Sequence, residues 1–343
     1  MAYVYRHFIP QNTAPAGTKR IGVYDGNGKR IMAIPLGGLT PHSTESLYSF
    51  GIVSDLHISH NTAVAWQPIS KFDNALTLLE EKGCAFCIAC GDLTNTGFYL
   101  RTDENTAGTE YMDEQQFAKY KEICDKHTIP VYEICGNHES YYGMPITSNL
   151  VLLETYTGKN VLAYTVTHGN ELFILCGQPK DAWVMTADDY EWLKTTLAAN
   201  TGKRCFVVVH SYIEEDSGDP MDFRENSIFK TWVPETMNLT NDFMNLLRQY
   251  DNVILLHGHS HTKFQCQELD ENANYTERNG FKSVHVPSLG TPRDLNLETK
   301  KTVDDPEASQ GYLVDVYDNC IVLTGMDFIN NKPVPLGVYK INM

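Results

Sequence analysis

Short apolar runs alternate with helix-like segments through the middle of the chain. The runs YSFGIV, AFCIAC, VYEIC, CFVVVH and VILLH are typical of strands buried on both faces. Between the first two runs, Phe72, Leu76 and Leu79 recur at helical spacing, and Gly83 then gives a stop signal. Thr186 stands where it can cap a later helix. The alternation predicts an α/β fold in which helices cover a buried sheet.

The pattern changes towards both ends of the chain. Near the C-terminus, GYLVDVY, CIVLTGMDF and PLGVYKIN are strand-like with few helices between them, which predicts a mixed sheet or a second sheet packed on the first. Near the N-terminus, RIGVY and RIMAIPL flank the turn-rich DGNGK and predict a hairpin over residues 20–36. We therefore expect a hairpin appendage and linker at residues 1–45, followed by one main domain at 46–343.

Composition narrows the possible partners. The chain of 343 residues has 43 acidic and 27 basic side chains, a net charge of −16, so its surface repels long polyanions and we expect no long nucleic-acid partner. The N-terminus has no apolar segment of the signal-peptide type, and no stretch approaches the roughly 18 apolar residues of a membrane span. These features predict a cytoplasmic protein without a membrane partner. The nine cysteines lie mostly in apolar runs, as expected for reduced core thiols. The oligomeric state stays open.

Polar residues follow each buried run. The first is followed by Asp55 and His57, the second by Asp92, the third by Asn137, His138 and Glu139, the fourth by His210, and the last by His257, His259 and His261. Strand ends of an open α/β sheet meet at one rim, so these groups are predicted to converge. Gly258 predicts a break that stops the last three histidines from continuing as a strand. A metal would satisfy several buried imidazoles at one place, because neutral imidazole is the commonest metal-binding side chain.

The same blocks resemble the signature of the calcineurin-like metallophosphoesterase superfamily, which runs D-x-H, G-D, G-N-H-[DE], a lone H and G-H-x-H. Here they read DLH at 55–57, GD at 91–92, GNHE at 136–139, His210 and GHSH at 258–261, in that order. The resemblance implies an α/β, four-layer sandwich of two packed mixed β-sheets flanked by helices. It also implies a dinuclear metal site at the carboxyl ends of the strands.

The resemblance further implies roles for individual residues. One ion would be held by Asp55, His57 and His261, the other by Asn137, His210 and His259, and both by a bridging Asp92. His138 would protonate the leaving oxygen while a hydroxide between the ions attacks phosphorus. This mixture of nitrogen and oxygen ligands suits two divalent transition ions, drawn from Mn, Fe, Zn, Ni and Co, better than Ca or Mg. His257 lies outside the ligand set and is expected either to be structural or to support a ligand residue.

Departures from two branches of the superfamily narrow the substrate. Ser/Thr protein phosphatases have Asp and Arg where this chain has Asn95 and Thr96, and an Arg in place of Cys135. Purple acid phosphatases have a metal-bound tyrosine where Asn95 stands. The chain instead resembles small phosphodiesterases, which predicts hydrolysis of small phosphate esters, with a diester or nucleotide preferred over a monoester.

Several alternatives stay open. Asn95 either orients His138 or bonds a substrate phosphate oxygen, and Glu139 is either a buried supporting group or a solvated side chain. Further candidate substrate contacts are Tyr141, Tyr142 and Arg293. A non-catalytic binding or scaffold protein of the same fold is the main alternative to an enzyme, because the N-terminal hairpin has no catalytic explanation. A nuclease relative is disfavoured by the net charge.

Overall fold

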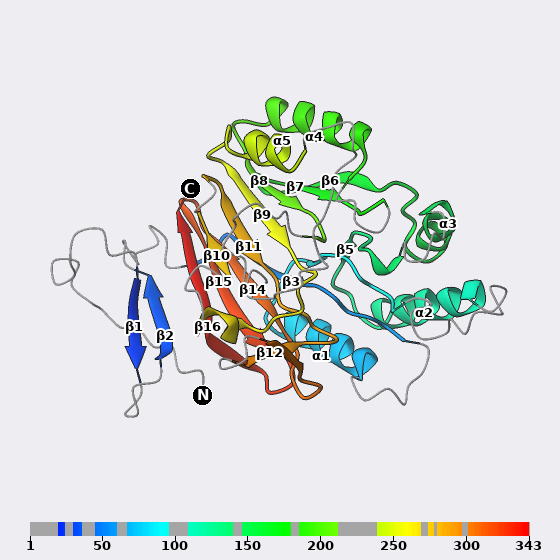
Figure 1. Ribbon diagram of the computed structural model, residues 1–343, viewed down its shortest axis with the longest axis horizontal. Coiled ribbons are helices and arrows are strands. Elements are labelled where there is room, and N and C mark those ends of the chain that lie inside the picture. The colour runs from blue at the N-terminus through cyan, green and yellow to red at the C-terminus, as the bar shows by residue number, and fades with distance from the viewer. Residues whose placement is uncertain are drawn as a thin grey trace.

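Two six-stranded mixed sheets packed face to face form the centre of the molecule (Figure 1). The computed structural model describes residues 20–24, 30–35, 45–59, 67–95, 109–139, 146–179, 185–211, 239–268, 274–277, 280–296 and 301–342. In the first sheet the order is β16-β15-β14-β3-β4-β5, and in the second it is β10-β11-β9-β8-β7-β6.

The strands of the first sheet are β3 (Tyr48–Val53), β4 (Cys87–Ala89), β5 (Val131–Glu133), β14 (Gln310–Val316), β15 (Cys320–Asp327) and β16 (Lys332–Asn342). Its members β3, β4 and β5 are parallel, whereas β14 joins β3 antiparallel and carries β15 and β16. The strands of the second sheet are β6 (Ala163–His168), β7 (Glu171–Cys176), β8 (Arg204–Val208), β9 (Val253–His257), β10 (Tyr275–Thr276) and β11 (Lys282–His285). Strands β7, β8, β9 and β11 run parallel, and β6 and β10 are antiparallel edges.

Helices cover the outer faces of both sheets. The first sheet is covered by α1 (Pro68–Glu81), α2 (Thr109–Cys124) and α3 (Ile146–Thr157), and the second by α4 (Ala187–Ala199) and α5 (Leu239–Leu247). Between the sheets, Phe50 and Phe173 are fully buried with ring centroids 5.2 Å apart. Burial of one such side chain contributes about 1.5–3 kcal/mol. The predicted four-layer α/β sandwich is confirmed.

The local signals for helix ends are also confirmed. Pro68 begins α1, and Gly83 just beyond its end adopts a positive φ of 72°. The hydroxyl of Thr186 caps α4 by accepting a hydrogen bond from the backbone N–H of Asp189 at 3.0 Å. Each of these ends leaves backbone groups that the helix itself cannot pair, so the sequence must supply the partner or the turn.

One geometric expectation was too simple. The strands that precede the polar blocks do not share one open sheet: β3, β4 and β5 lie in the first sheet, and β8 and β9 in the second. The polar blocks therefore approach one another from the rims of two packed sheets. Pairing of β3 with β14, far along the chain, decides this arrangement.

The N-terminal hairpin is present as predicted. Strands β1 (Arg20–Tyr24) and β2 (Arg30–Pro35) pair antiparallel, with Ile21 opposite Ile34. The other residues before 45 lie outside the described part of the chain, so the boundary between appendage and main domain stays a prediction. Of the described helices, none is both long and apolar enough to span a bilayer.

Candidate metal centre

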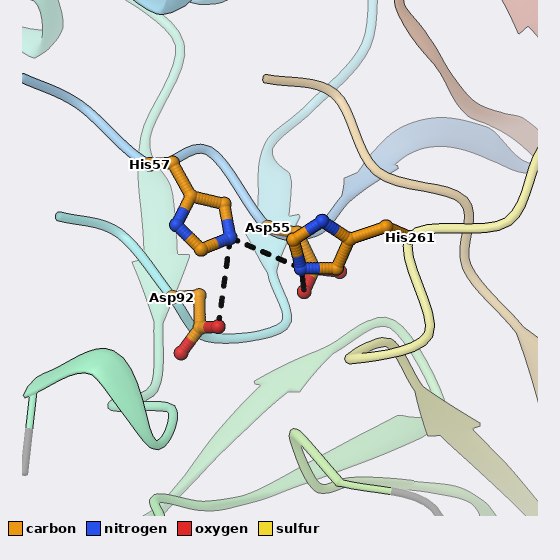
Figure 2. A group of neighbouring side chains, drawn as sticks. All are labelled: Asp55, His57, Asp92 and His261. Carbon is orange, nitrogen blue, oxygen red and sulfur yellow. Dashed lines mark hydrogen bonds and ion pairs between the residues drawn. The ribbon is translucent and has the colours of Figure 1, made fainter. Parts of the chain in front are cut away.

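The polar blocks of the sequence converge where the rims of the two sheets meet. Figure 2 shows four of these side chains pointing toward one another: Asp55 and His57 from the segment after β3, Asp92 from the segment after β4, and His261 from the segment after β9. Three segments follow their strands closely: Asp55 follows β3, Asp92 follows β4, and residues 258–261 follow β9, so each strand places its next residues at the rim. The convergence predicted from the sequence is thus present.

The first group of side chains consists of Asp55, His57, Asp92 and His261, whose potential ligand atoms lie within 4.8 Å of one another. His261 Nε2 lies 3.1 Å from Asp55 Oδ1 and 3.1 Å from His57 Nε2. His57 Nε2 lies 3.6 Å from Asp92 Oδ2. All four residues are buried, at 7% exposure or less.

The second group consists of Asp92, His210 and His259, again with potential ligand atoms within 4.8 Å of one another. His210 Nε2 lies 3.2 Å from Asp92 Oδ2 and 3.3 Å from His259 Nδ1. The side-chain oxygen of Asn137 lies 3.0 Å from the same nitrogen. Asp92 is common to both groups, so its carboxylate lies between them.

The donor atoms of these groups fit metal ions better than they fit one another. Ligand atoms about 2.1 Å from one ion are roughly 3.0–3.4 Å apart in octahedral or tetrahedral geometry. Five contacts within the two groups have such spacings, 3.0–3.3 Å, and the sixth, between His57 Nε2 and Asp92 Oδ2, is longer at 3.6 Å. Asp92 Oδ2 is fully buried and accepts no well-aligned hydrogen bond from the described residues, which is costly for a carboxylate unless a cation is its partner.

Backbone carbonyls orient two of the ligand imidazoles. His210 Nδ1 lies 2.8 Å from the carbonyl oxygen of Cys90, and His261 Nδ1 lies 3.1 Å from that of Thr291. A carbonyl oxygen can only accept, so each of these nitrogens carries the proton and donates it. When a ring is neutral, its Nε2 then faces the cluster with a lone pair available, as is usual for metal-bound histidine.

Backbone strain is concentrated at the same residues. Seven non-glycine residues in the described ranges have positive φ, and five of them are Asp55 (51°), His57 (50°), Asp92 (50°), His259 (73°) and His261 (60°). Positive φ is uncommon for residues with a side chain, and such outliers gather at functional sites. The turns after β3, β4 and β9 are therefore held in strained backbone conformations, and these conformations direct the side chains to one site.

Two glycines of the motifs leave room for the converging side chains. A Cβ on Gly136 would lie 2.2 Å from Asp92 Oδ1, and one on Gly258 would lie 2.7 Å from Asp55 Oδ2. No side chain can be accommodated at such distances without displacing a carboxylate. The glycines of GNHE and GHSH are explained by this close packing.

Burial and neighbouring charges shift the pKa values of the clustered histidines. Burial lowers the pKa of His259 to about 3, and the neighbouring His210 lowers it further, so the ring is neutral near pH 7. Burial, followed by the charges of His138 and His261, also holds the pKa of His57 well below its usual value. His210 differs, because Asp92 and Asp55 outweigh its burial and raise its pKa to about 9. The Asp92 carboxylate thus attracts the one proton-bearing imidazole among these three.

Glu139 is a buried hydrogen-bond acceptor next to the site. It is fully buried, so the solvated alternative is wrong. Its carboxylate accepts hydrogen bonds from the backbone N–H of Thr94 at 2.8 Å, the Thr94 hydroxyl at 3.0 Å and the backbone N–H of Gly136 at 2.6 Å. Burial, together with the charge of Asp92, raises its pKa to about 7. Glu139 thereby ties the GD turn to the GNHE turn.

His138 lies at the edge of the cluster and is oriented by Asn95 through the backbone. Its Nδ1 lies 3.2 Å from the carbonyl oxygen of Asn95, while its Nε2 lies 3.9 Å from Asp92 Oδ2. The contact is with the main chain, so it does not depend on the amide side chain that the sequence indicated. The ring also meets His57 edge to face, with centroids 4.3 Å apart.

The remaining candidates have different outcomes. Tyr141 and Tyr142 lie outside the described residues. Arg293 begins β12 (Arg293–Asn296), which pairs with β13 (Lys301–Asp304), and its guanidinium lies 3.4 Å from Asp304. His257 is the last residue of β9 and is buried, apart from the two groups described above.

Sequence reasoning missed the supporting segment SLGT at residues 288–291. Thr291 contacts His261 through both its carbonyl and its hydroxyl, the latter at 2.8 Å from Nδ1. Ser288 donates its hydroxyl hydrogen to the carbonyl oxygen of Asp55 at 2.9 Å. Small polar residues in a loop carry no periodic signal, so only their place in the fold reveals these contacts.

The two-sheet sandwich and its rim cluster define a class of metal-dependent phosphoesterases, and sequence comparison agrees. The sequence model for calcineurin-like phosphoesterases matches residues 48–263. The chain belongs to this family and is a phosphoesterase. Family and cluster together imply a dinuclear divalent metal centre and hydrolysis of phosphate esters.

Solved structures show the same fold at low sequence identity. A dimetal phosphatase from Danio rerio is 12% identical with a TM-score of 0.58, over 87% of this chain and 99% of its own. A purple acid phosphatase from yellow lupin is 15% identical with a TM-score of 0.54, over 94% of this chain and 59% of its own. None of the curated protein sequences compared with the chain matches it.

Proposed function

We propose that this phosphoesterase cleaves small phosphate esters at two divalent transition ions that share Asp92. One ion would be held by Asp55, His57 and His261, and the other by Asn137, His210 and His259. The observation that carries the proposal is the position of Asp92 Oδ2, which is buried without an aligned donor and common to both ligand groups. When bound, such ions lower the pKa of a bound water and neutralise charge that develops on phosphoryl oxygens.

His138 is proposed as the general acid. The Asn95 carbonyl holds its Nδ1, so a second proton on the ring resides on Nε2, the nitrogen that lies 3.9 Å from Asp92 Oδ2. A proton on this nitrogen therefore lies beside Asp92, between the two proposed ion positions. Its transfer to the leaving oxygen prevents an unstable alkoxide from forming, a contribution of typically 10²–10⁴ in rate.

The charge of the site favours a small diester or nucleotide over a monoester. Near neutral pH a phosphodiester carries one negative charge, whereas a monoester carries up to two. Cys135 precedes the GNHE block where protein phosphatases have a phosphate-binding arginine, and Asn95 and Thr96 replace another charged pair. With fewer cations beside the ions and a net charge of −16, the second charge of a monoester is supported less well.

The test combines metal analysis with hydrolysis. Purified protein should contain close to two transition ions per chain and should cleave bis(nitrophenyl) phosphate faster than nitrophenyl phosphate. Asp92→Asn should lose both metal and activity, whereas Asp251→Asn, at an exposed turn, should retain both. Wild-type protein that binds no metal and cleaves no ester across a panel of divalent ions would support a binding or scaffold role instead.

The role of His138 is tested by changing the leaving group. His138→Gln should slow cleavage of a nucleoside ester by about 10²–10⁴, because its alkoxide needs a proton. The same variant should cleave a nitrophenyl ester nearly as fast as wild type, because nitrophenolate leaves without a proton. His168→Gln, at a half-buried histidine in β6, is the matched control. Equal losses on both esters would mean that His138 is only structural.

A further inference from the structure

The 288–291 turn connects two proposed ligands of the same ion. It follows β11 and runs beside the end of β3, where Ser54 and Ser288 form an isolated parallel bridge. Its hydrogen bonds reach Asp55 on one side and His261 on the other. Both of these residues have positive φ, so their positions depend on contacts that hold the strained backbone.

Asp55 is held through its backbone carbonyl. The hydroxyl of Ser288 donates to this oxygen at 2.9 Å, and the backbone N–H of Gly290 donates to it at 3.0 Å. Ser288 is fully buried, and its hydroxyl oxygen also accepts from the backbone N–H of Thr291 at 2.9 Å. The Ser288 hydroxyl therefore joins Thr291, at the far end of the turn, to the backbone of Asp55.

His261 is held through its ring. Thr291 presents two oxygens to His261 Nδ1, the carbonyl at 3.1 Å and the hydroxyl at 2.8 Å. Both accept the Nδ1 proton, which leaves Nε2 unprotonated and directed at Asp55 Oδ1, 3.1 Å away. The backbone N–H of Arg293 donates to the carbonyl of His261 at 2.7 Å and fixes the main chain as well.

The 288–291 turn is itself held by a hydrogen bond from helix α1. The buried Lys71 of α1 donates to the carbonyl oxygen of Gly290 at 2.9 Å. In the other ligand group, His210 is oriented by a different partner, the carbonyl of Cys90. The two groups share Asp92 and are also linked by the backbone N–H of His259, which donates to the Asp55 carboxylate at 3.1 Å, whereas Thr291 contacts the imidazole of His261 directly.

We propose that the 288–291 turn is a positioning element for the ion held by Asp55, His57 and His261, with Thr291 as its principal side chain. This inference rests on the ligand assignment of the proposed function and adds that the Thr291 hydroxyl acts directly on a ligand of one of the two ions. Loss of the Thr291 hydroxyl should weaken one ion and leave the other nearly unchanged. Neighbours of this kind typically change metal affinity by 10–100-fold.

The experiment is a metal titration of Thr291→Val, which keeps the shape of the side chain and its carbonyl but removes the hydroxyl. Metal-depleted full-length protein is titrated with Co²⁺, and binding is followed by calorimetry and by the visible absorption of the bound ion. We expect one dissociation constant to rise about tenfold and the other to stay within about twofold, because the carbonyl acceptor remains. Thr291→Ser restores a hydroxyl and should restore wild-type binding.

Two further variants complete the design. Thr324→Val, at a half-buried threonine in β15, controls for the substitution itself and should bind as wild type. Ser288→Ala tests the Asp55 side of the turn if Thr291→Val does not fold, and it should weaken the same ion more than the other. Unchanged binding by the folded variants, or equal weakening of both ions, overturns the inference. Wild-type protein that binds no Co²⁺ overturns the proposed function and this inference with it.

Discussion

A single methyl group at Gly136 should disable the site, although Gly136 has no side chain of its own. In Gly136→Ala the new Cβ would lie 2.2 Å from Asp92 Oδ1, 2.5 Å from the Asp92 backbone nitrogen and 2.8 Å from Cδ2 of His210. All three atoms belong to proposed metal ligands: two are side-chain atoms of Asp92 and His210, and the third is the main-chain nitrogen of Asp92. The methyl cannot be accommodated by moving one flexible side chain.

The size of the effect follows from these distances. Carbon–oxygen contacts lie at about 3.3 Å or more, so the Asp92 carboxylate or the Gly136 backbone must move by about 1 Å. Overpacking of this kind typically costs about 1–3 kcal/mol of stability. For a chain of this size, that lowers the melting temperature by roughly 2–4 °C. A displacement of about 1 Å at reacting groups costs about 10²-fold in rate, so activity should fall far more than stability.

The assay compares Gly136→Ala with Gly202→Ala. A Cβ at Gly202 would meet no atom within 4 Å, so this control adds a methyl group without a clash. Metal content, phosphodiester hydrolysis and thermal unfolding are measured on both variants. The reasoning is refuted if Gly136→Ala keeps two ions and wild-type turnover, or if both variants lose activity equally.

Three other predictions concern metal removal and local stability. Chelation should abolish hydrolysis and lower the melting temperature. Ions restored at 100 times their Kd should add about 2.7 kcal/mol of stability per bound ion, but not in Asp92→Asn, as calorimetry would show. Hydrogen bonds, first from His127 and then from Thr128, lower the pKa of Glu80 from 4.5 to about 2, so the carboxylate stabilises the fold above about pH 4.5 and this stabilisation is lost as the pH falls towards 2. Glu80→Gln should therefore be less stable than wild type at pH 6 in urea unfolding, and the gap should narrow in acid; a constant gap would contradict this. Thr186→Ala should cost about 1 kcal/mol by removing the cap of α4, whereas Thr186→Ser should cost much less, and equal losses in thermal unfolding would argue against the cap.

The sequence predicted the strands that feed the site because their signals are local. An apolar run bounded by a glycine or a polar block predicts a strand whatever its later place in the fold. Strands β3, β8 and β9 all form where their apolar runs occur. The break at Gly258 was predicted for the same reason, since a residue without a side chain weakens a strand at its own position. The residue types after each strand also indicated metal chemistry before any fold was known.

The sequence could not say which sheet each strand would join. Strand β3 pairs with β14 across more than half of the chain, and no local pattern distinguishes this partner from other apolar strands. The partition of β3, β4 and β5 from β8 and β9 was therefore decided by packing of the two sheets against each other. That partition places Asp92 between the two ligand groups.

The sequence by itself thus determined the elements and the chemical types at their ends, because periodicity, capping and side-chain chemistry act within a few residues. Only the tertiary structure decided how those groups are oriented. The carbonyls of Cys90, Asn95 and Thr291 each fix an imidazole. Every residue carries such a carbonyl, so nothing in the sequence marks these three, and only the packing of distant segments brings each one to a histidine.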